Sequence, residues 1–240
     1  MTQNFIFIDI DGPLLPGRAH LDRQNRAFLD AFHSGMKLTE LLEKHPPVFD
    51  PWAVRAHNLL AKYSDARIVI VTNWRRWATI EELQRLFDSQ GLVFEYADPI
   101  GCMKRGMSSE RVHDIACHIE DCLPDNSRAL IIDDADLSWL NGFMPLENLD
   151  PETATFNHYD VPDHDDEQVG YVEGKNIRWK WLKVDYLNGL SYDQFKLGAD
   201  FLEVDWDQLN YQEFGVPILS PEEKAKRREE TDRLWSALIV

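Results

Sequence analysis

The chain has 240 residues, of which 44% are hydrophobic, so it can bury a full core as one elaborated domain or as one domain with a small satellite. Its formal net charge of −17 opposes broad, non-specific binding of DNA or RNA, because like charges repel at long range. No apolar run approaches membrane-spanning length and no signal peptide precedes the first strand, so we expect a cytoplasmic protein without membrane partners.

The first predicted element is a strand over residues 5–8, an uninterrupted apolar run that is typical of a strand buried on both faces. It leads into Asp9 and Asp11 and then into a turn at Gly12 and Pro13. Two carboxylates at this spacing point the same way, so both stay ionised only beside a cation or other positive groups. An aspartate can attack phosphorus, and a second one can protonate the leaving oxygen and later activate water. A solvated turn after a strand is the alternative.

Two helical patterns follow, at about residues 21–44 and 51–63, separated by the breaker HPPVFDP. The second pattern predicts the crossover helix of a right-handed βαβ unit. The first lies within residues 13–50, which could form a small helical cap over the site. Packing of this helix onto the core is the alternative.

A second buried strand is predicted over residues 67–71, followed by a helix with the sequence IEELQRLF. Thr72, at the end of this strand, is well placed to hold a phosphate oxygen, a role that is compatible with capping a helix. We assign Asn73 and Arg75 to substrate binding. Trp74 and Trp77 flank the arginines and could stack nucleobases, although packing of Trp77 into the following helix and solvated arginines is the favoured interpretation.

Further along, Lys104 precedes a helical pattern over residues 108–119 and would supply a fixed positive charge. A third buried strand, residues 129–132, ends in Asp133 and Asp134, with Asp136 close behind. Adjacent acids after an apolar strand suit the coordination of a hard cation by oxygen. The three cysteines of the chain lack CxxC spacing, so we expect them to be reduced.

The ordered set DxDG, then hydrophobic-TN, then Lys, then hydrophobic-DD resembles the haloacid dehalogenase (HAD) superfamily of phosphotransferases over about residues 4–140. The resemblance implies an α/β, Rossmann-like HAD fold: a central parallel sheet with helices on both faces and a small or minimal cap. The segment FDPWAVRAHNLLAKYSDARIVIVTNWRR is similar to small bacterial and phage HAD-domain proteins, including nucleic-acid end-repair types.

Carried over by position, the resemblance implies a role for each member of the site. Asp9 would be the nucleophile and Asp11 the general acid and base, while Thr72 and Lys104 would hold the phosphate. The ligands of Mg²⁺ would be Asp9, the backbone carbonyl of Asp11, and Asp133, with Asp134 or Asp136 completing the site. Pro13 departs from the family pattern and puts one loop contact in doubt.

The C-terminal third matches the family pattern less. Residues 143–176 are rich in acids and predict an exposed insertion, after which a strand from Ile177, the last of the parallel sheet, leads to a helix capped near Ser191. We therefore place a HAD-like domain over residues 1–203 and an extension with a terminal helix over residues 204–240.

The function predicted from these observations is a Mg²⁺-dependent phosphatase that hydrolyses a phosphomonoester, a small phosphometabolite or nucleotide, through an aspartyl-phosphate. One alternative is a 3′- or 5′-end phosphatase of polynucleotides in repair, which the negative charge disfavours. A non-catalytic HAD-fold binding protein is the other alternative. The sequence leaves the oligomeric state open.

Overall fold

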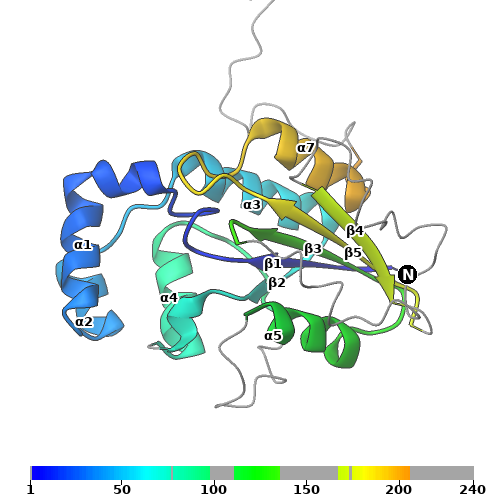
Figure 1. Ribbon diagram of the computed structural model, residues 1–240, viewed down its shortest axis with the longest axis horizontal. Helices are drawn as coiled ribbons and strands as arrows, with labels where there is room; N and C mark the ends of the chain where they lie inside the picture. Colours follow the sequence, from blue (N-terminus) through cyan, green and yellow to red (C-terminus); the bar gives the residue numbers. More distant parts are fainter. Residues whose placement is uncertain (1, 77, 98–110, 136–166, 173–174, 206–240) are drawn as a thin grey trace, which may run out of the picture. The chain divides into compact units, whose positions relative to one another are not determined.

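The computed structural model describes residues 2–76, 78–97, 111–135, 167–172 and 175–205. A five-stranded sheet with the order β2-β1-β3-β5-β4 forms its centre (Figure 1). The strands are β1 (Gln3–Ile8), β2 (Arg67–Ile70), β3 (Ser127–Asp133), β4 (Glu167–Val172) and β5 (Ile177–Lys183). The helices are η1 (Gly17–Leu21), α1 (Arg23–His33), α2 (Leu38–Lys44), α3 (Pro51–Ser64), η2 (Asn73–Arg76), α4 (Ile80–Ser89), α5 (Arg111–Cys117), the π-helical turn η3 (His118–Cys122) and α7 (Tyr192–Phe201).

The strands alternate their side chains between two covered faces of the sheet. On one face Phe7, Ile131 and Trp179 are fully buried and pack with Ile115 of α5 and Ile119 of η3. Figure 1 shows α3 and α7 on the side of the sheet opposite α5. The predicted α/β fold, with a parallel sheet between helices, is confirmed for strands β2, β1, β3 and β5.

Close packing on the second face depends on a glycine in α7. A Cβ atom added at Gly198 would lie 3.0 Å from Leu130 of β3 and 3.3 Å from Leu182 of β5. The helix therefore approaches the sheet more closely than a larger residue would allow. The helix begins where the sequence predicts, since the Ser191 hydroxyl accepts from the Gln194 backbone N–H in a capping box.

The register of the parallel strands brings their carboxyl ends to one edge. Ile8 of β1 pairs with Ile70 on one side and with Ile132 on the other. The residues that follow these positions, Asp9 and Asp133, therefore leave the sheet side by side. Ligands bind at this edge in open α/β sheets.

Three local expectations were wrong. The helical pattern over residues 21–44 divides into α1 and α2, because the chain turns through Gly35 at a φ of +88°, which favours glycine. Residues 167–172, assigned to an exposed acidic insertion, form the antiparallel edge strand β4, whose pairing with β5 buries Val172. Cys122 is disulfide-bonded, so the expectation that all three cysteines are reduced was wrong, because the absence of CxxC spacing does not exclude a bridge between cysteines further apart in the chain.

Other expectations concern residues that lie outside the described ranges. These are Trp77, Lys104, Asp136, residues 143–166 of the acidic insertion and residues 206–240 of the C-terminal extension. None of the helices in the described ranges has the length and apolar composition that crossing a membrane requires.

A buried histidine on α3 predicts a pH-dependent stability. His57 is fully buried, and its Nδ1–H donates to the Ala53 carbonyl at 2.7 Å. Loss of hydration lowers its pKa from 6.5 to about 4. The unfolded chain therefore takes up this proton first, so stability present above pH 6.5 is lost as the pH falls towards 4.

We expect this histidine to account for about 3 kcal/mol of the loss in the free energy of unfolding over that range. Urea unfolding at several pH values should show a shallower dependence in His57→Leu than in the wild type. The partly exposed His45, changed to Gln, is the control and should keep the wild-type slope. Equal slopes in the wild type and His57→Leu would contradict the prediction.

Candidate active site

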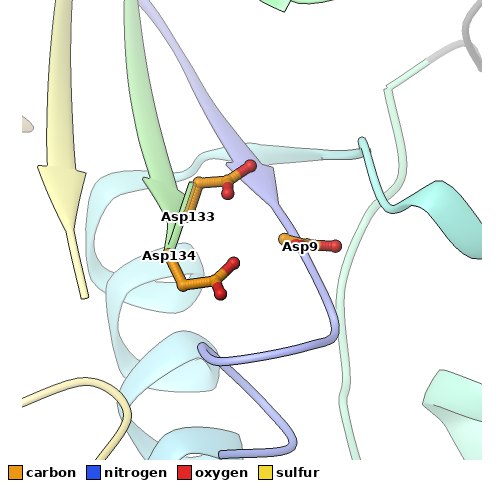
Figure 2. Close-up of side chains that lie close together, drawn as sticks. All are labelled: Asp9, Asp133 and Asp134. Atoms are coloured by element: carbon orange, nitrogen blue, oxygen red, sulfur yellow. The ribbon is translucent and has the colours of Figure 1, made fainter. Parts of the chain in front are cut away.

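Three aspartates meet at the carboxyl edge of the sheet. Figure 2 shows Asp9 just past β1 and Asp133 and Asp134 at the end of β3. One carboxylate oxygen from each lies within 4.8 Å of the others. Asp9 is 1% exposed and Asp133 is fully buried, whereas Asp134 is partly exposed. The group is therefore open to solvent on the side of Asp134.

Backbone amides orient two of these carboxylates. The Ile10 N–H donates to Asp9 Oδ1 at 2.8 Å, and the Ala135 N–H donates to Asp133 Oδ1 at the same distance. Hydrogen bonds from N–H groups favour the ionised form of a carboxylate. Each aspartate is thus fixed by the turn that follows its own strand.

The donor set fits a divalent metal ion. Buried carboxylates this close together repel one another and lose hydration, so a cation among them offsets a large electrostatic cost. All of the donors are carboxylate oxygens, which hard cations prefer. The predicted metal ligands Asp9, Asp133 and Asp134 are therefore brought together, while the choice of Mg²⁺ stays a prediction.

Asp11 lies in the turn after β1, and its carboxylate is not one of these three ligands. Its Oδ2 accepts a hydrogen bond of 2.8 Å from the indole Nε1–H of Trp74. The predicted metal contact of Asp11 is through its backbone carbonyl, and the role of its carboxylate as general acid and base stays a prediction. Sequence reasoning missed the bond to Trp74, because the two residues are 63 positions apart.

Thr72 follows β2 and is fully buried. Its hydroxyl accepts a hydrogen bond of 3.3 Å from the Trp74 backbone N–H, which is the capping interaction that its position predicts. The hydroxyl proton remains available as a donor, because this bond uses only an acceptor lone pair. Its role in holding phosphate stays a prediction.

The two predicted substrate-binding residues lie in η2. Arg75 forms an ion pair with Asp114 of α5, and both side chains are 14% exposed. Arg75 thus links η2 to α5, and a contact with substrate would be made in addition to this pair. Asn73 is partly exposed and carries a buried Oδ1 that has no hydrogen-bond partner among the described residues.

Trp74 does not have the exposure that stacking a nucleobase requires. Its ring is 3% exposed and stacks on Phe28 and Phe32 of α1, with centroids 5.5 and 5.0 Å away. The prediction that this ring could receive a base is therefore wrong, because its surface is covered by the helix.

Tyr186 is an exposed aromatic residue close to the carboxylates that sequence reasoning missed. It follows β5 and is 43% exposed. Burial first, and then the negative charges of Asp11 and Asp134, raise its pKa. Its ring lies against Gly17, whose N–H donates to the Tyr186 carbonyl at 2.7 Å. Its position three residues after the end of β5, at the edge where the other site residues lie, was the signal available in the sequence.

The turn of Gly12 determines how closely Asp134 approaches β1. Gly12 has a φ of +83°, and an added Cβ would lie 2.6 Å from the Cβ of Asp134. That distance is shorter than any normal contact, so only glycine fits between the two loops.

The sequence also matches the model of a known protein family. The family model described as "HAD domain in Swiss Army Knife RNA repair proteins" matches residues 5–155, which is more than half of the chain. This range contains Asp9, Asp11, Asp133 and Asp134. No significant match was found among curated proteins or solved structures.

Gly12→Ala should weaken metal binding by displacing Asp134. We expect a loss of Mg²⁺ affinity of about tenfold or more, as is typical when a ligand's support is disturbed. Isothermal titration calorimetry would measure it. Gly91→Ala is the matched control, because Gly91 has a φ of +79° and no atom of the described part of the chain lies within 4 Å of an added Cβ.

Both substitutions impose a similar backbone strain of about 1 kcal/mol, so only Gly12→Ala adds a steric clash at the site. Equal Mg²⁺ affinities in the two variants would contradict the placement of Asp134 in the metal site.

Proposed function

The chain belongs to the HAD-domain family of Swiss Army Knife RNA repair proteins, and from this premise we propose that it is a Mg²⁺-dependent phosphatase. The substrate is a phosphomonoester, and the reaction passes through an aspartyl-phosphate. The observation that carries the proposal is the meeting of Asp9, Asp133 and Asp134 within 4.8 Å at the carboxyl edge of the sheet. Asp11 lies in the turn that follows Asp9.

In the first step a carboxylate oxygen of Asp9 attacks phosphorus. The bond from phosphorus to the leaving oxygen breaks, and that oxygen keeps the electron pair and takes a proton from the Asp11 carboxyl group. In the second step water attacks the phosphorus of the aspartyl-phosphate and gives a proton to the Asp11 carboxylate. Inorganic phosphate leaves, and the Asp9 carboxylate is restored.

The remaining residues of the site stabilise charge and orient the phosphoryl group. Asp9, Asp133 and Asp134 would hold Mg²⁺, which neutralises negative charge on the phosphoryl oxygens when bound. The Thr72 hydroxyl proton is suited to a phosphoryl oxygen, since its lone pair already accepts from Trp74. Lys104 lies outside the described residues, and its proposed contribution is a positive charge near the phosphate.

Asp9→Asn should lower the rate of hydrolysis of an aryl phosphate by about a thousandfold or more, because the amide is a poor nucleophile. Release of inorganic phosphate in the presence of Mg²⁺ would measure it, with circular dichroism to verify that the variant is folded. Retention of full activity would exclude the aspartyl-phosphate mechanism. Absence of activity in the wild type towards every phosphomonoester tested would favour the non-catalytic alternative.

A second candidate narrows the substrate to the phosphorylated end of an RNA. The family description favours this candidate, because it refers to RNA repair proteins. The exposed ring of Tyr186, near Asp11 and Asp134, offers a surface on which the base next to the scissile phosphate could stack. The net charge of −17 opposes it, so recognition would depend on a few local contacts rather than on the whole surface.

Tyr186→Ala should raise the KM for a 3′- or 5′-phosphorylated oligoribonucleotide by about fivefold or more, because stacking of one base contributes about 1–3 kcal/mol. The KM for glycerol phosphate, which has no base, should stay within about twofold of the wild type. Tyr192→Ala is the control, since Tyr192 is 50% exposed and contacts Trp52 and Phe195 instead.

The same measurements at several salt concentrations separate the two candidates. A steep salt dependence for the oligoribonucleotide, together with a clear preference over glycerol phosphate, would support the RNA-end candidate. Equal specificity constants and a shallow salt dependence would assign the enzyme to small phosphomonoesters.

A further inference from the structure

We propose that Trp74 is a positioning residue for Asp11, and that its aromatic contacts make helix α1 part of the alignment of the catalytic acid. This inference rests on the proposed function, since it takes Asp11 to be the proton donor. Helix α1 lies within residues 13–50, the region predicted to form a cap, and the inference assigns it a role in catalysis.

The first argument is the chemistry of the hydrogen bond. The Trp74 Nε1–H donates to Asp11 Oδ2 at 2.8 Å, and an indole nitrogen is a donor only. Asp11 Oδ2 therefore accepts this bond, which fixes the rotation of the carboxyl group in the turn after β1. Trp74 thus orients the group that delivers the proton to the leaving oxygen in the proposed reaction.

The second argument is that the indole ring is held in place from α1. Phe32 stacks on Trp74 at a centroid distance of 5.0 Å with an interplanar angle of 28°, and Phe28 does so at 5.5 Å and 21°. Phe28 is fully buried and Trp74 is 3% exposed. A ring packed in this way has little freedom to turn its N–H away from Asp11.

The third argument concerns the anchoring of α1. Asn25, in the first turn of the helix, is 2% exposed. Its Nδ2 donates to the carbonyls of Ala19 and Val48 at 3.1 and 2.9 Å, and its Oδ1 accepts from the Val48 N–H at 2.7 Å. These bonds tie α1 to the chain on both sides of it. The helix whose phenylalanines stack on Trp74 is therefore anchored at its first turn.

Trp74 also contacts a second proposed site residue. Its backbone N–H donates to the Thr72 hydroxyl, while its side chain donates to Asp11. One residue thereby joins the turn after β1 to the turn after β2. Because both turns face the phosphoryl group in the proposed reaction, a change in Trp74 would alter the two together.

If the role of Trp74 were purely structural, its substitution would lower activity equally for substrates with good and poor leaving groups. A series of substrates that differ in their leaving group therefore distinguishes the two roles. The rate constant kcat/KM reports the steps up to transfer of the phosphoryl group to Asp9, and it depends on the general acid most when the leaving group is poor. In Trp74→Phe a smaller aromatic ring replaces the indole and the N–H is lost. We expect kcat/KM for an alkyl phosphate to fall about tenfold or more, and for p-nitrophenyl phosphate to fall by less than about threefold.

The matched control is Trp52→Phe. The Trp52 Nε1–H donates to the Leu190 carbonyl at 2.8 Å, so the same substitution removes an indole hydrogen bond that does not involve a site carboxylate. In this variant the ratio of the kcat/KM values for the two substrates should equal that of the wild type.

A double-mutant cycle tests whether Trp74 acts through Asp11. Adding Trp74→Phe to Asp11→Asn should cause no further change in the ratio of kcat/KM values for the two substrates, because the acid is already absent. If Trp74→Phe changed this ratio by the same factor in the wild type and in Asp11→Asn, the role of Trp74 would be structural and the inference would be overturned.

A measurement without turnover follows the hydrogen bond itself. The indole N–H resonance of Trp74, assigned by its loss in Trp74→Phe, should shift in Asp11→Asn, whereas the Trp52 resonance should not. An unchanged Trp74 resonance would overturn the inference.

The kinetic outcomes also separate this inference from the proposed function. A wild-type enzyme that depends on Asp9, with an unchanged leaving-group ratio in Trp74→Phe, would overturn the role of Trp74 alone. Absence of Asp9-dependent activity in the wild type would overturn both.

Discussion

The parallel pairing of β1 with β3 is the constraint on which the site depends. Its register places Ile8 beside Ile132, and the Asp9 N–H continues the ladder by donating to the Ile132 carbonyl at 3.3 Å. Asp9 and Asp133 are therefore held together by backbone hydrogen bonds, against the repulsion of their charges. The central strands provide this rigidity because they are buried on both faces. A bound cation would stabilise the folded chain as well as the reaction.

Close approach of three loops completes the constraint. Gly12 leaves room for Asp134, and Gly189, after β5, lies so near that an added Cβ would be 3.2 Å from the Gly12 carbonyl oxygen. The loop containing Tyr186 is thereby brought against the turn that follows the proposed nucleophile. Loops that meet through glycines have little space to adjust, so the site is preorganised by packing as well as by hydrogen bonds.

The parts of this arrangement that the sequence could predict are those that depend on neighbours along the chain. Asp9 and Asp133 were identifiable because each directly follows a short apolar run, and the ends of parallel strands share an edge. The contact between Arg75 and Asp114 depends instead on how η2 and α5 pack, which no local pattern encodes. Strand β4 was missed for a different reason: it pairs with the next strand along the chain, but the acidic composition of residues 143–176 favoured an exposed insertion.

Trp74 illustrates how burial changes the meaning of a residue. A tryptophan beside arginines is a reasonable candidate for stacking on a nucleobase, but this ring is covered by α1 and its N–H is engaged by Asp11. The aromatic surface needed for a base is instead available at Tyr186, which is exposed near the same carboxylates. In the two proposals these aromatic residues have different roles: Trp74 orients the acid, and Tyr186 offers the exposed ring on which a base stacks. Selection of the substrate and delivery of the proton can consequently be altered independently.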